Sequence, residues 1–280
     1  MIRAARRIVL GASVVALLLV TVVYGHLQGA FVAARTPAEI DDLLAPYDEL
    51  YRPAGAGPFP AVVLFHGCGG LRDSLRQWAE LLRDAGVLVV ATDSYTGRRL
   101  AWQDVCRGWK LLGGERAGDV WVSLARVRQR PDVDSKRVAL VGWSHGAWSV
   151  MELFALADGD RPPGLGEAPR TAPSQVAGLV LLYPYCGLAA RARRRWLGAP
   201  PTLMLLAGSD SIVSSDACRT WGNAHPGVTT HVYPGVDHGF DQAVASGDWP
   251  SSYDEVAARD ARRRVLSFLL ARIGPFGSAP

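Results

Sequence analysis

One serine stands at the centre of the segment Gly142-Trp143-Ser144-His145-Gly146, which follows the apolar run 138–141 and leads into a helical stretch. A buried strand, a sharp turn and a helix start, in that order, are typical of a nucleophile elbow. Such a turn strains the serine toward positive φ and lifts its hydroxyl out of the backbone. Only glycine is expected to fit at positions 142 and 146, because a Cβ there would collide where the chain folds back. The pattern predicts that Ser144 attacks a carbonyl carbon.

A serine nucleophile also needs a base, and the base needs an acid to orient it. Asp210 comes after the apolar run 203–206, and His238 lies in a turn-rich loop after the run 229–233. We predict that His238 accepts the proton of Ser144 and that Asp210 bonds to the other ring nitrogen of His238. The chain order Ser, Asp, His is one that serine hydrolases use.

Each of these assignments has a structural alternative. Ser144 and Asp210 can each serve as a simple cap on the helix that follows. Asp216 is a reserve acid, unless it caps the helix in which it lies. A lone histidine is more often structural than catalytic, so we interpret His225 and His231 as ordinary surface or sheet residues.

The oxygen that becomes negative during the attack needs hydrogen-bond donors already aimed at it. Two backbone N–H groups are candidates by position: that of His145, directly after the nucleophile, and that of Cys68, in the glycine-rich loop 66–70. The cysteine spacings show no zinc-type pair. We therefore predict a site that uses neither a metal nor an organic cofactor.

The elements that position these residues follow from hydrophobic patterning. The predicted strands are 61–65, 87–91, 138–141, 179–182, 203–206 and 229–233, and the predicted helices are 72–85, 115–130, 145–157, 214–224 and 254–272. The strand runs are almost continuously apolar, as burial on both faces requires. This alternation predicts an α/β fold with a mostly parallel central sheet covered by helices on both faces. Residues 158–174 are predicted to form a surface loop, and 274–280 a frayed tail.

The chain begins with a segment that we exclude from the fold. Arg3, Arg6 and Arg7 precede the uncharged stretch 8–24, which is rich in Val, Leu and Ala. This is typical of an export signal or a membrane anchor. Val32-Ala33-Ala34 is a tolerable cleavage site, but we favour the anchor. The arginines are expected to stay in the cytoplasm, which places the catalytic domain in the periplasm or outside the cell.

We accordingly divide the chain into an N-terminal signal or anchor, residues 1–30, and a hydrolase domain, residues 35–280. Exported proteins keep disulfides, and the chain has four cysteines, Cys68, Cys106, Cys186 and Cys218. Four cysteines allow three pairings. The leading hypothesis is a disulfide between Cys186 and Cys218, because both follow neighbouring parallel strands.

Composition argues for a globular protein without a nucleic-acid partner. Of the 280 residues, 49% are hydrophobic and 20% charged, which excludes a disordered chain. The net charge is +4, but three of these charges belong to Arg3, Arg6 and Arg7, so the remainder is close to neutral. We also interpret the basic run 191–195 as a solvated helix face. The sequence leaves the oligomeric state open.

Taken together, these motifs resemble the dienelactone hydrolase-like family of the α/β-hydrolase superfamily over about residues 45–272. The residues that carry the resemblance are His66-Gly67-Cys68-Gly69-Gly70-Leu71, Asp93-Ser94-Tyr95, Gly142-Trp143-Ser144-His145-Gly146, Tyr183-Pro184, Gly208-Ser209-Asp210 and His238-Gly239-Phe240. The resemblance implies an α/β-hydrolase fold, the triad Ser144, Asp210 and His238, and an oxyanion hole at Cys68 and His145.

Two departures from that family bear on the substrate. The founding members use a cysteine nucleophile, whereas this chain has Ser144. They also bind an anionic substrate through arginines, one of them close behind the catalytic histidine, where this chain has Gly239-Phe240-Asp241-Gln242. Arg98 or Arg99 could still face a substrate carboxylate, but we interpret both as solvent-facing loop residues. We therefore predict a serine hydrolase that cleaves small carboxylic esters through an acyl-enzyme; the alternatives are a peptidase of the same fold and a non-catalytic binding or envelope protein.

Overall fold

A computed structural model describes residues 2–156, 160–169, 175–196, 198, 200–243 and 252–274, with side chains from residue 9 onward. One sheet has the strand order β1-β3-β2-β4-β5-β6-β7. The strands are β1 (Glu49–Tyr51), β2 (Phe59–Phe65), β3 (Leu88–Thr92), β4 (Val133–Trp143), β5 (Gly178–Leu182), β6 (Thr202–Ala207) and β7 (Val228–Tyr233). All neighbouring pairs in this sheet are parallel except β1 with β3.

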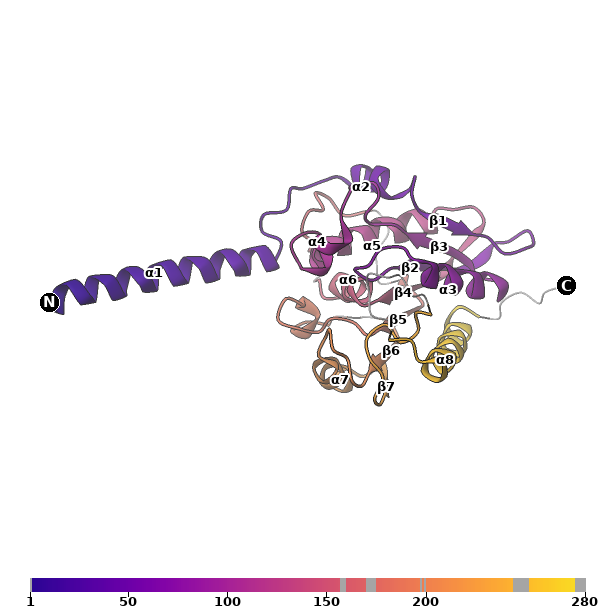
Figure 1. Cartoon of the computed structure of the whole chain (residues 1–280). Coiled ribbons are helices and arrows are strands. Elements are labelled where there is room, and N and C mark those ends of the chain that lie inside the picture. Colours follow the sequence, from indigo (N-terminus) through magenta and orange to yellow (C-terminus); the bar gives the residue numbers. More distant parts are fainter. Residues whose placement is uncertain are drawn as a thin grey trace.

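Helices cover both faces of the sheet (Figure 1). They are α2 (Pro37–Leu44), α3 (Asp73–Asp84), α4 (Trp102–Cys106), α5 (Gly113–Arg128), α6 (His145–Phe154), α7 (Ser215–Asn223) and α8 (Glu255–Ile273), with a short 3-10 turn η2 (Arg191–Arg193). Every residue of β2 is buried, because alternate side chains enter opposite layers. Val63 packs in the layer of α5, α6 and α7, and Val62 and Leu64 pack in the layer of α3 and α8. The predicted α/β fold, with a mostly parallel sheet and helices on both faces, is confirmed.

Each of the six predicted strands and five predicted helices is present, with small shifts at the ends. Helix α6 ends at Phe154, three residues earlier than predicted. Strand β1 was not predicted, because Glu-Leu-Tyr is too short to show a hydrophobic period. It lies antiparallel at the edge of the sheet beside β3.

The predicted surface loop lies only partly within the described residues. Residues 160–169 contain neither helix nor strand, and Leu165 forms an isolated bridge with Arg35. Residues 157–159 and 170–174 lie outside the description, as does 275–280 of the predicted tail.

Helix α1 (Ile2–Leu27) projects away from the body of the molecule (Figure 1). Its stretch Val9–Leu27, 19 residues, is long and apolar enough to cross a membrane, and none of it is buried against the protein. Length and composition of this kind are shared by membrane anchors and export signals.

Candidate active site

Ser144 lies at the turn between β4 and α6, with φ 50° and ψ −112°. The predicted positive φ is therefore present. A Cβ on Gly142 would lie 2.6 Å from the backbone N of Ala147, and one on Gly146 would lie 2.1 Å from the carbonyl oxygen of Phe65. Both glycines are thus required by close backbone contacts, as predicted. Ser144 occupies the N-cap position of α6 but its side chain makes no capping bond, which argues against the simple cap.

This crowding gives a prediction for stability. We expect Gly146→Ala to destabilise the protein by about 2–4 kcal/mol, because the backbone carbonyl it would strike cannot move aside as a side chain can. Gly118→Ala on α5 is the matched control, since its Cβ would meet Ile40 at 3.6 Å, an ordinary contact. That variant is expected to match or exceed the parent by up to about 1 kcal/mol. Urea unfolding measures both; equal stability of the two variants would contradict the packing argument.

The structure brings the three predicted triad residues together. Ser144 Oγ lies 2.9 Å from His238 Nε2, and His238 Nδ1 lies 2.8 Å from Asp210 Oδ2. The Asp210 side chain is fully shielded from solvent and that of His238 is 7% exposed. Asp210 Oδ1 accepts hydrogen bonds from the backbone N–H groups of Ile212 and Val213 at 2.9 and 2.8 Å. These bonds fix the carboxylate so that its second oxygen faces the imidazole.

Asp216 is neither the carboxylate that contacts His238 nor the cap of α7. Its side chain is 84% exposed and pairs with Arg219 at 2.8 Å. Ser214 caps α7 instead, by accepting a hydrogen bond from the N–H of Ala217.

A second carboxylate joins the loop of His238 to the loop of Asp210. Asp237 Oδ1 accepts hydrogen bonds from the backbone N–H groups of Ser211, at 2.7 Å, and of His238, at 2.6 Å. Burial opposes ionisation here, but these bonds hold the pKa of Asp237 below its usual value. The ionised carboxylate thereby fixes the spacing of the two loops.

Next to Ser144 lies the loop 66–70, which follows β2. A Cβ on Gly67 would lie 3.5 Å from Ser144 Cβ, so this loop packs directly against the elbow. Its Cys68 forms a disulfide with Cys106 at the end of α4. The predicted Cys186–Cys218 disulfide is also present. Among the described residues, no group of three or more His, Cys, Asp or Glu side chains is placed to hold a metal ion.

Arg116, which the sequence analysis did not single out, lies buried behind this loop. Its Nε donates to Ser94 Oγ at 2.9 Å and its Nη1 to the carbonyl of His66 at 2.7 Å. The same Nη1 lies 3.2 Å from His145 Nδ1. Burial, reinforced by the Arg116 charge, lowers the pKa of His66 and of His145 well below the usual value. Both rings are therefore neutral, and one cation contacts the two segments that carry the candidate oxyanion donors.

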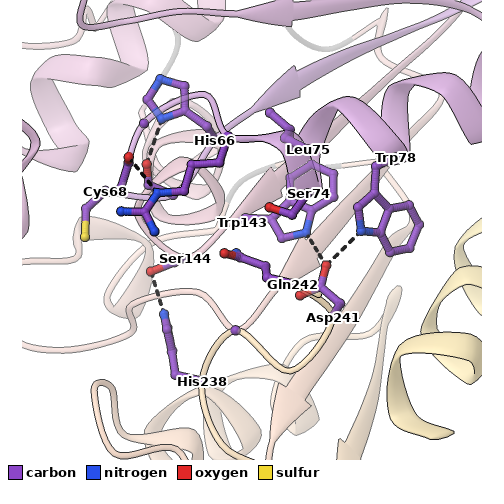
Figure 2. A pocket seen from close by; sticks show the side chains of 15 residues that line it. His66, Cys68, Ser74, Leu75, Trp78, Trp143, Ser144, His238, Asp241 and Gln242 are labelled. Carbon is purple, nitrogen blue, oxygen red and sulfur yellow. Dashed lines mark hydrogen bonds between the residues drawn. The ribbon is translucent and has the colours of Figure 1, made fainter. Parts of the chain in front are cut away.

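A small pocket of about 50 Å³ opens beside Ser144 and His238 (Figure 2). Its wall is organised by Asp241, a buried carboxylate three residues after His238. Asp241 accepts hydrogen bonds from the indole N–H groups of Trp78 and Trp143, both at 2.8 Å, and from Tyr183 OH at 2.6 Å. The segment 239–242 that follows His238 therefore contributes a carboxylate to the pocket wall and contains no arginine.

The prediction for the two loop arginines was right for only one of them. Arg99 is exposed, but Arg98 forms a nearly buried ion pair with Asp119 at 2.6 Å. Arg98 was assigned to solvent because an isolated loop arginine usually faces water. Its buried partner on α5 is distant in sequence.

Comparison with known proteins agrees with this fold. A protein of Azospirillum brasilense, provisionally named a carboxymethylenebutenolidase, is 26% identical over 260 residues, covering 85% of this chain and 97% of the relative. Esterase 2 of Thermogutta terrifontis, phosphorylated by paraoxon, superposes with TM-score 0.65 at 19% identity, covering 83% of this chain and 90% of that one. A provisionally named dienelactone hydrolase from Klebsiella pneumoniae superposes with TM-score 0.62 at 20% identity, covering 79% and 91%.

The sheet order, the elbow and these neighbours show an α/β-hydrolase fold. The sequence profile of the dienelactone hydrolase family matches residues 49–160 and 170–272. The chain belongs to the dienelactone hydrolase family.

Proposed function

We propose that this protein hydrolyses small carboxylic esters with the triad Ser144, His238 and Asp210, through an acyl-enzyme. The observation that carries the proposal is the continuous chain of contacts from Ser144 Oγ through the His238 ring to Asp210, 2.9 and 2.8 Å long. Neutral His238 with its proton on Nδ1 donates to Asp210 and leaves Nε2 free to accept the serine proton.

In the first half of the reaction, Ser144 Oγ bonds to the ester carbonyl carbon while its proton passes to His238 Nε2. Asp210 stabilises the imidazolium that forms. The N–H groups of Cys68 and His145 donate to the oxyanion. The tetrahedral intermediate then collapses, the alcohol leaves with the proton from His238, and the acyl group stays on Ser144.

In the second half, water takes the place of the alcohol. His238 accepts a proton from the water as its oxygen bonds to the acyl carbon, and returns that proton to Ser144 Oγ as the carboxylic acid leaves. The same donors serve the second oxyanion.

Two features favour small, uncharged esters over an anionic lactone. Asp241 contributes a carboxylate to the pocket lining, and the segment Gly239-Phe240-Asp241-Gln242 after His238 has no arginine to bind an anionic substrate. The volume of about 50 Å³ has room for only a few water molecules, which suits a short acyl group. Structures of the Thermogutta esterase hold propionate and butyrate.

Arg116 is proposed as a positioning residue for the oxyanion hole. We expect Arg116→Met to lower kcat about 100-fold with KM nearly unchanged, because the loss of an aligned oxyanion donor acts on the transition state. Arg116→Lys keeps the cation and is expected to recover part of kcat. Steady-state kinetics on folded protein, checked by circular dichroism, measure the split. If Arg116→Met lowers stability but leaves the kcat of the folded fraction unchanged, Arg116 is only structural.

We further propose that residues 1–30 anchor the protein in a membrane and that 35–280 form the catalytic domain outside the cytoplasm. The apolar stretch Val9–Leu27 supports the anchor. The two disulfides are consistent with export, since disulfides persist in oxidising compartments.

Labelling with paraoxon tests the proposed chemistry. The full chain in mild detergent is treated with the reagent, digested and mapped by mass spectrometry. We expect one phosphoryl adduct, on Ser144, and its loss in Ser144→Ala and in His238→Ala. The Ser74→Ala variant is the matched control, since Ser74 lines the same pocket and is expected to leave the adduct on Ser144. A folded protein that gives no adduct, or one labelled on Ser144 equally well without His238, would contradict the triad.

A further inference from the structure

An apolar groove of about 770 Å³, here called the α1 groove, lies between the C-terminal end of α1 and residues of the segment 188–194. Leu19, Val23 and Leu27 line it from α1, and Leu188, Arg193 and Arg194 line it from the body. Leu188 is 77% exposed, although it is a large hydrophobic side chain. The groove is therefore an apolar surface that ends at two guanidinium groups.

The charges around the groove are not balanced. The basic run 191–195 contains four arginines, and two of them have acidic partners: Arg191 with Glu152 at 3.7 Å and Arg195 with Asp160 at 3.5 Å. Arg193 and Arg194 pair with no carboxylate among the described residues. These two are the arginines that line the groove. Arg193, Arg194 and Arg195 are exposed, as predicted from the sequence, although the run forms a short 3-10 turn rather than a helix face.

The contact between Arg194 and α1 shows where Arg194 would lie relative to a bilayer that α1 spans. The stretch Val9–Leu27, 19 residues, is about 28 Å long at 1.5 Å per residue, close to the thickness of a bilayer's hydrocarbon core. Tyr24 lies one turn before the end of this stretch, and its OH accepts a hydrogen bond from Arg194 Nη1 at 3.5 Å. Tyrosine is enriched where hydrocarbon meets headgroups, and arginine suits phosphate geometrically. If α1 spans a bilayer, Arg194 therefore lies at the level of the headgroups.

We infer that the α1 groove binds an anionic phospholipid from the bilayer that α1 spans. The acyl chain lies along Leu19, Val23 and Leu188, and the headgroup phosphate lies against Arg193 and Arg194. An anionic amphiphile satisfies both halves of the site, because the walls are apolar and the two cations have no other counter-charge within the described chain. The inference rests on the proposed anchor and not on the proposed ester hydrolysis. It gives the catalytic domain a second fixed point on the membrane.

Photo-crosslinking from position 188 tests the site directly. The full chain carrying Leu188→p-benzoylphenylalanine is reconstituted in vesicles of equal parts phosphatidylcholine and phosphatidylglycerol, and irradiated. We expect adducts of mainly phosphatidylglycerol at position 188. The matched position is Val256 on α8, which has the same 77% exposure and does not line the α1 groove, and we expect no lipid adduct there.

Charge variants then separate a specific site from general attraction. Adding R193Q and R194Q is expected to lower the phosphatidylglycerol adduct about 30-fold, because each basic group near an anionic surface contributes a factor of about five. R259Q with R263Q, exposed arginines on α8, lowers the net charge equally and is expected to change nothing.

Three results would overturn the inference. They are no excess of lipid adduct at 188 over 256, an adduct that ignores R193Q and R194Q, and an intact mass showing that the exported chain has lost α1. Paraoxon labelling of Ser144 in the same sample tests the triad independently of the lipid site. Failure of the lipid site and failure of the triad are therefore distinguishable.

Discussion

Replacing Ser144 with alanine is expected to lower kcat for a short-chain ester about a million-fold. In the proposed mechanism the Ser144 hydroxyl oxygen forms the acyl-enzyme, and no other side chain that lines the pocket is both bonded to His238 and raised on a turn with φ 50°. What remains should be slow attack by water, assisted by the N–H groups of Cys68 and His145.

A chromogenic acetate ester, followed with purified protein, measures this loss. The unchanged protein is expected to show a burst as the acyl-enzyme accumulates, and Ser144→Ala is expected to show none. Ser74→Ala again serves as the control and is expected to retain most of the activity. If Ser144→Ala turns over the ester at a rate near that of the parent, the hydrolysis does not pass through this serine.

Asp210→Asn has the second largest expected effect, a loss of about 10,000-fold in kcat. The amide keeps the shape of the carboxylate, but its NH₂ can face His238 Nδ1 and favour the tautomer with the proton on Nε2. That proton then points at Ser144, and the ring no longer accepts the serine proton. The adjacent N–H groups of Ile212 and Val213 hold the side chain in place, so the fold is expected to be kept.

Asp216→Asn distinguishes the two acids of this region. Because Asp216 is 84% exposed and paired with Arg219, its amide variant is expected to keep the parental kcat. Parallel assays of the two variants on the same ester provide the comparison. A severe loss in Asp216→Asn, or near-normal activity in Asp210→Asn, would reverse the assignment.

The fold could be predicted wherever burial shapes the sequence on its own. Strands β2, β5 and β6 are buried on both faces, so each one is a continuous apolar run. Strand β1 could not be found, because three residues at a sheet edge carry no period. Helix α2 was missed for a similar reason, since only Ile40 and Leu44 of its eight residues are buried.

Some residues of the candidate site could also be predicted from the sequence, and others could not. Ser144, Asp210 and His238 each follow a strand, and parallel strands bring their carboxyl ends to one edge. Arg116 and Asp241 give no such signal, since their partners lie in other elements far along the chain. The buried arginine lies between small residues, in Gly113-Gly114-Glu115-Arg116-Ala117-Gly118, and that clue was available.

Because of the disulfide between Cys68 and Cys106, the geometry of the site depends on the redox state of the compartment that holds the protein. The disulfide fixes the loop beside Ser144 covalently, in addition to the hydrogen bond from Arg116 to the His66 carbonyl. Thiols stay reduced in a cytoplasm, so on the proposed export route this bond forms only once the chain has reached an oxidising compartment. On that proposal we expect full hydrolase activity only after this oxidation, so that esters in the reducing compartment are spared.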